Sequence, residues 1–128
     1  MRIVFWQNCL SPHQLPYIGR LLDDNRVDEV VIVAGTSISS DRKSMGWELP
    51  HYNGIEKCQV HVMPNDKLIG SILSARQEDS WHLFSGIRAD GFVFHCIKMS
   101  MDLTLSRGMV TELPCTYDFK RNTENAKP

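Results

Sequence analysis

Short apolar runs alternate with amphipathic stretches along the chain, and this alternation predicts the order of the strands. Residues 2–8 and 29–34 are nearly continuous runs of β-branched and aromatic side chains. Such runs are typical of strands that are buried on both faces of a parallel sheet. Weaker apolar runs, which are shorter or alternate with polar residues, predict further strands at residues 58–63, 81–85 and 108–111.

Between these runs, apolar residues recur at helical spacing in three places. The first helix follows Ser11-Pro12-His13-Gln14, in which serine is a favourable N-cap, proline suits the first turn and S-x-x-Q forms a capping box. We expect this helix to end at residues 23–25. The second helix is capped by Asn65 or Asp66, and the third covers residues 89–100.

The resulting order of elements, strand–helix–strand–loop–strand–helix–strand–helix–strand, predicts an α/β fold. Its loop is the polar segment 38–57, which follows a predicted turn at Gly35-Thr36-Ser37. Parallel strands joined by right-handed crossovers form a Rossmann-like, doubly wound open sheet, here of about five parallel strands with helices on both faces. We therefore expect one Rossmann-like domain over residues 1–119, and a polar tail or the start of an interdomain linker over residues 120–128.

Composition limits the classes of protein to which the chain can belong. Its 128 residues fit one domain, and 42% hydrophobic with 23% charged residues exclude wholesale disorder. A net charge of −1 argues against nucleic acid as a partner, because proteins that bind it are clearly basic. Residues 1–6 are too short for a signal peptide and no apolar run reaches the ~20 residues of a membrane span, so we expect a cytoplasmic protein.

Neither a metal site nor a cofactor is predicted. No two histidines have a metal-ligand spacing, and no C-x-x-C pair occurs among Cys9, Cys58, Cys96 and Cys115. Widely spaced cysteines of this kind are typical of small buried thiols. The sequence also lacks G-x-G-x-x-G and G-x-x-x-x-G-K-[ST], so neither a dinucleotide site nor a P-loop is expected.

Polar residues gather where the predicted strands end. In an open parallel sheet, ligands bind outside the carboxyl ends of the strands, at the point where the strand order switches. His13 lies in the first turn of a helix, whose positive end disfavours the protonated imidazole. A neutral imidazole there could bind a hydroxyl or act as a base. Alternatively, Ser11 and Gln14 only cap the helix and His13 is solvated.

Two further candidates follow the fourth and fifth predicted strands. Arg88, just after the flexible Gly86, could bind a phosphate or carboxylate through two N–H groups, or it could pair with Asp90 on a helix surface. Glu112 is the lone carboxylate at the end of the fifth strand, where it is either functional or a simple loop carboxylate. The residues by themselves leave these alternatives open.

Three segments together resemble a known enzyme family. They are M-R-I-V-F-W-Q-N-C-L-S-P-H-Q (residues 1–14), H-L-F-S-G-I-R (82–88) and S-R-G-M-V-T-E-L-P (106–114). These segments resemble the N-terminal domain of GT-B glycosyltransferases, in particular the bacterial, family-4-type retaining enzymes. The resemblance covers residues 1 to 115 and implies a two-domain enzyme that needs no catalytic metal. Its N-terminal half mainly holds the acceptor, and its C-terminal half mainly holds the nucleotide-sugar.

The resemblance also implies roles for individual residues. His13 or Glu112 would orient the acceptor hydroxyl as catalytic residues. The residues implied in substrate binding are Asn8, Ser11, Gln14, Gly86 and Arg88. The chain ends at Pro128, before the half that would bind the nucleotide, so we expect this fragment to be inactive by itself.

The expected partners follow from the same resemblance. They are an acceptor glycan or lipid-linked sugar, and a nucleotide-sugar donor bound mainly through the absent C-terminal domain. Association with a membrane surface and a homodimer through the exposed interdomain surface are also compatible with it. The alternative is a free-standing, flavodoxin-like binding or interaction module without catalysis. A small hydrolase is disfavoured because the sequence has no G-x-S-x-G motif.

Overall fold

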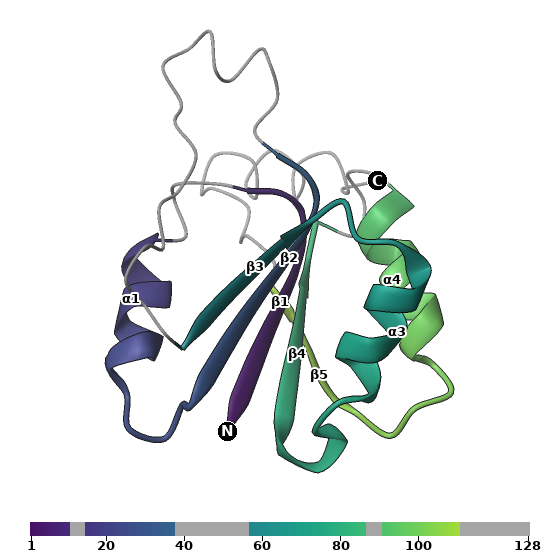
Figure 1. Ribbon diagram of the computed structural model, residues 1–128. Coiled ribbons are helices and arrows are strands. Elements are labelled where there is room, and N and C mark those ends of the chain that lie inside the picture. Colours follow the sequence, from purple (N-terminus) through teal and green to yellow (C-terminus); the bar gives the residue numbers. More distant parts are fainter. Residues whose placement is uncertain (11–14, 38–56, 87–90, 111–128) are drawn as a thin grey trace, which may run out of the picture.

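The computed structural model describes residues 1–10, 15–37, 57–86 and 91–110. These residues form a five-stranded sheet in which every neighbouring pair of strands is parallel, with the strand order β3-β2-β1-β4-β5. Helix α1 covers one face of the sheet, and α3 and α4 cover the other (Figure 1). The predicted α/β, Rossmann-like, doubly wound class is therefore confirmed.

The elements follow the predicted order along the chain. The strands are β1 (Arg2–Cys9), β2 (Glu29–Thr36), β3 (Cys58–Val62), β4 (Ser80–Ser85) and β5 (Ser106–Val110). The helices are α1 (Leu15–Asp23), α3 (Asp66–Ser74), the short 3-10 helix η2 (Gln77–Asp79) and α4 (Gly91–Ser100). Asn65 caps α3 as predicted, since its side-chain oxygen accepts a hydrogen bond of 2.8 Å from the backbone N–H of Leu68.

The continuous apolar run of β1 is explained by two hydrophobic cores, one on each face of the sheet. Ile3 and Phe5 belong to the core under α1, whereas Val4 and Trp6 belong to the core under α3 and α4. Successive side chains of a strand point to opposite faces, so a strand covered on both sides needs apolar residues at every position. The central position of β1 in the sheet follows from this pattern.

One sequence prediction about the strands is wrong. Gly35 and Thr36 continue β2 and do not form a turn, because Thr36 pairs with Cys9 and its carbonyl accepts a hydrogen bond from the N–H of Leu10. At Gly35, an added Cβ would lie 2.7 Å from Cγ of Phe92, so a glycine is needed for α4 to approach β2. His82 lies inside β4, within the strand predicted at residues 81–85, and its side chain is fully buried.

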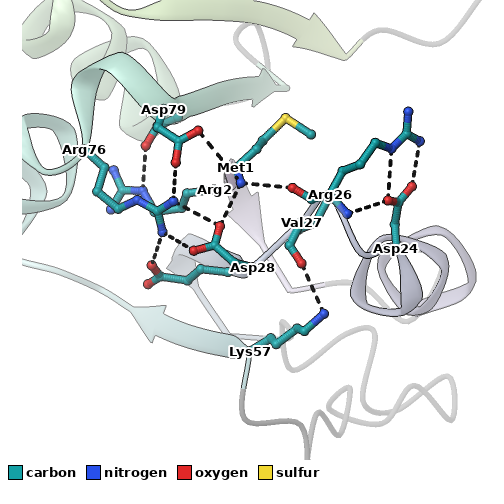
Figure 2. Close-up of polar contacts among 11 residues, drawn as sticks. Met1, Arg2, Asp24, Arg26, Val27, Asp28, Lys57, Arg76 and Asp79 are labelled. Atoms are coloured by element: carbon teal, nitrogen blue, oxygen red, sulfur yellow. Dashed lines mark hydrogen bonds and ion pairs between the residues drawn. The ribbon is translucent and has the colours of Figure 1, made fainter.

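Charged groups gather at the amino ends of the strands (Figure 2). The α-amino group of Met1 lies 2.9 Å from a carboxylate oxygen of Asp28, and the guanidinium of Arg76 lies 2.8 Å from the other oxygen. Arg76 also pairs with Asp79 at 2.5 Å and with Glu29 at 3.4 Å. These contacts join the start of β1, the start of β2 and the segment between α3 and β4 at one edge of the sheet.

No helix in the described segments is long and apolar enough to cross a membrane.

Candidate functional site

The strand order places a switch point between β1 and β4. From β1 the chain proceeds through α1 to β2 on one side, and from β4 it proceeds through α4 to β5 on the other side. The two connections cover opposite faces of the sheet, and in open parallel sheets ligands bind outside the carboxyl ends of the strands at such a point. Asn8, near the end of β1, and Gly86, just after β4, lie at this edge of the sheet.

Asn8 and Gly86 are in direct contact. The side-chain Nδ2 of Asn8 donates a hydrogen bond of 2.6 Å to the carbonyl oxygen of Gly86. Gly86 has a φ of +72°, and a Cβ at this position would lie 2.6 Å from Nδ2 of Asn8. Both the left-handed backbone and the lack of space favour glycine. Both residues were expected at the carboxyl edge of the sheet, and the structure adds that they are in contact there.

Two hydroxyl groups connect the ends of three strands around this contact. Oγ1 of Thr36 in β2 donates to the carbonyl oxygen of Asn8 at 3.2 Å. Oγ of Ser85 in β4 donates to the carbonyl oxygen of Trp6 at 3.3 Å. Both are side-chain contacts to the backbone of β1, so the ends of β1, β2 and β4 are held together by neutral polar groups.

Several polar atoms at the end of β1 are buried without a hydrogen-bond partner among the described residues. They are Oδ1 of Asn8 and both amide atoms of Gln7, Nε2 and Oε1. Gln7 is only 3% exposed. Sequence reasoning missed Gln7, although a polar residue inside an apolar strand that is buried on both faces is the signal that could have found it.

The other predicted site residues lie outside the described residues. They are Ser11, His13, Gln14, Arg88 and Glu112. Their roles in catalysis and substrate binding remain predictions from the sequence. The geometry at the edge therefore rests on Gln7, Asn8 and Gly86.

The side chains at this edge are uncharged in the described part of the chain. No Asp, Glu, Lys, Arg or His occurs in the described residues 7–10, 34–37 or 84–86, which end β1, β2 and β4. The described residues contain no group of three or more His, Cys, Asp or Glu placed to hold a metal ion.

Burial, assisted by Asp66, raises the pKa of the Cys96 thiol to about 12, so this thiol is not a nucleophile at neutral pH.

Comparison of the chain with protein-family models, curated proteins and solved structures found no match.

The strand order of the sheet distinguishes between two related folds. The order 3-2-1-4-5 of the described sheet is that of the Rossmann fold, whereas flavodoxin-like sheets have the order 2-1-3-4-5. The alternative interpretation, a free-standing binding or interaction module, is therefore wrong in its flavodoxin-like fold.

Proposed function

We propose that the chain is the acceptor-binding, N-terminal half of a glycosyltransferase. The enzyme transfers a sugar from a nucleotide-sugar to a polysaccharide or lipid-linked acceptor, in the cytoplasm and at the membrane surface. One observation carries the proposal. The resemblance to GT-B enzymes depends in part on segments 1–14 and 82–88, and one residue of each, Asn8 and Gly86, meet at the switch point through a hydrogen bond.

The chemistry of the edge supports an acceptor rather than a donor. A sugar acceptor presents hydroxyl groups, which amides and hydroxyls bind well, whereas a nucleotide diphosphate needs cations or clustered backbone N–H groups. The described ends of β1, β2 and β4 supply amide and hydroxyl groups and no cation. The diphosphate would be bound mainly by a C-terminal domain, with Arg88 as the contribution of this half.

Catalysis in this proposal depends on orientation and on charge stabilisation. Holding the acceptor hydroxyl against the anomeric carbon lowers the barrier by proximity, and groups that face the leaving diphosphate stabilise its developing charge. His13 or Glu112 would orient the acceptor hydroxyl. The fragment alone holds the acceptor without transferring a sugar.

Equilibrium binding tests the proposal. Methyl glycosides of glucose, galactose, mannose and N-acetylglucosamine are titrated into the folded chain, with UDP-glucose and GDP-mannose as the donor comparison. We expect at least one glycoside to bind, and the nucleotide-sugars to bind more weakly than it does. Asn8→Ala should weaken glycoside binding by about tenfold or more, the cost of a lost polar contact to the ligand.

The matched control is Asn25→Ala, which changes an exposed asparagine in the turn between α1 and β2. It should leave glycoside binding at the wild-type value. Failure of every glycoside to bind, or a preference for the nucleotide-sugars, would contradict the assignment of this chain to the acceptor half.

A further inference from the structure

Two polar side chains of β1 are buried, and they differ in how they are satisfied. At the amino end, Arg2 is 4% exposed and donates from Nε to Oγ of Ser80, and from Nη2 to the carbonyls of Ile72 and Ala75. At the carboxyl end, Gln7 is 3% exposed and makes no side-chain hydrogen bond within the described segments. On β1, the fold thus satisfies the buried group at the amino end and leaves unsatisfied the one at the carboxyl end. Within the described segments, Nε2 of His82 in β4 is the one other buried side-chain atom without a partner, apart from Oδ1 of Asn8.

An unsatisfied carboxamide is costly to keep inside a protein. Native structures contain few buried polar atoms without a partner, and each one lowers the stability of the folded state. Methionine or leucine would fill the same space without this cost. Residues that reduce stability in this way are characteristic of binding sites, where a ligand supplies the missing contacts.

The position of Gln7 identifies where such a ligand would lie. Gln7 pairs with Ala34 of β2, and strand alternation places it on the α1 face of the sheet, next to Phe5. Asn8 is the next residue and belongs to the opposite face, and its Oδ1 is likewise buried without a partner in the described part. Unsatisfied polar atoms therefore occur on both faces of β1, at the switch point between β1 and β4.

We propose that Gln7 is a ligand-recognition residue whose carboxamide bonds to hydroxyl groups of an uncharged saccharide at this edge of the sheet. A carboxamide donates and accepts hydrogen bonds at the same time, and neighbouring hydroxyl groups of a sugar ring can do the same. The described residues at the ends of β1, β2 and β4 carry no charged side chain that would bind an anion. The ligand class rests on the proposed function, whereas the effect of Gln7 on stability is measured without any ligand.

Thermal unfolding of the unliganded chain is the first arm of the test. Gln7→Met and Gln7→Leu remove the unsatisfied amide and keep most of its volume. At least one of them should raise the Tm by about 3 °C or more. Gln59→Met makes the same change at an exposed position of β3 and should alter the Tm by less than about 1 °C. A lower Tm for both Gln7 variants would show a structural partner for the amide and overturn the inference.

The second arm is ligand binding followed by NMR. The side-chain ¹⁵N–¹H₂ resonances of Gln7 should shift saturably as the methyl glycosides are added. Gln7→Met should weaken glycoside binding by about tenfold or more, while Gln59→Met should not weaken it. Glycosides that shift the backbone amides of Asn8 and Gly86 but not the Gln7 side chain would overturn the inference and leave the proposed function standing. Failure of every glycoside to bind wild-type protein would overturn the ligand class and the proposed function together.

Discussion

The indole Nε1 of Trp6 donates a hydrogen bond of 3.0 Å to Nδ1 of His82, between β1 and β4 in the centre of the sheet. The two rings are stacked with their centroids 6.0 Å apart, and Phe84 continues the stack. Because Nδ1 accepts a hydrogen bond, the neutral imidazole carries its proton on Nε2. The aromatic core beneath α3 and α4 is thus built around an uncharged histidine.

Stability should depend on pH through His82. Burial, with the positive charges of Arg2 and Arg107, lowers the pKa of His82 from about 6.5 to about 4. Between these two values the unfolded chain binds a proton that the folded chain does not bind. Stability therefore decreases as the pH falls through this window, by roughly 3 kcal/mol in total.

Urea unfolding at a series of pH values measures this contribution. His82→Asn removes the ionisable group and keeps a side chain that can accept a hydrogen bond from Trp6. The stability of this variant should therefore fall less than that of the wild type between pH 7 and pH 4. His61→Asn, at a half-buried position of β3, is the comparison variant, because it makes the same substitution at another histidine. Identical slopes for wild type and His82→Asn would show that His82 does not titrate in this window.

Gly86 should tolerate no side chain while Asn8 is in place. Gly86→Ala places a Cβ 2.6 Å from Nδ2 of Asn8 on a backbone with a φ of +72°, and should cost about 1–3 kcal/mol of unfolding free energy. The double variant Asn8→Ala/Gly86→Ala removes the clash but not the strained φ. Its loss should therefore be smaller than the sum of the two single losses, as measured in a double-mutant cycle.

Gly19→Ala is the control for this prediction. Its added Cβ meets nothing within 4 Å, and the residue lies inside α1. It should raise stability by about 0.5–1 kcal/mol, because alanine favours the helix. Additive losses in the Asn8/Gly86 cycle would contradict the contact between these two residues.

The charged cluster at the amino edge should contribute a stability that depends on salt. Arg76 and the α-amino group of Met1 hold the pKa of Asp28 well below its usual range. Asp28→Asn should lower the Tm by roughly 3 °C in dilute buffer and by less in 1 M NaCl, because ions screen exposed charges. Asp102→Asn, in the exposed turn after α4, is the control and should leave the Tm unchanged. An equal loss of Tm at both salt concentrations would exclude an electrostatic origin.

The sequence predicted the fold most reliably where burial leaves no choice of residue. β1 and β2 are covered on both faces, so their apolar runs are continuous and their assignment is simple. The burial of His82 was missed because a histidine among alternating residues gives no sign of which face is covered. The extension of β2 through Gly35 was missed because its cause, the approach of Phe92 from α4, is a tertiary contact.

The candidate site was predicted in part. Asn8 and Gly86 were placed at one edge because parallel strands end together, and this reasoning needs only the strand boundaries. Which strands are neighbours is set by the connections in three dimensions, so the hydrogen bond between these residues could not be derived from the sequence. Gln7 was missed because its significance depends on the absence of a partner in the described structure.

Mapping of glycoside binding by NMR tests the central claim most directly. The ¹⁵N-labelled chain is titrated with the methyl glycosides, and backbone amide shifts are compared between the two edges of the sheet. The account predicts saturable shifts at Asn8, Thr36 and Gly86, at the carboxyl edge, with Asp28 and Arg76 unchanged. Shifts confined to Asp28 and Arg76, or no saturable shift at either edge, would contradict it.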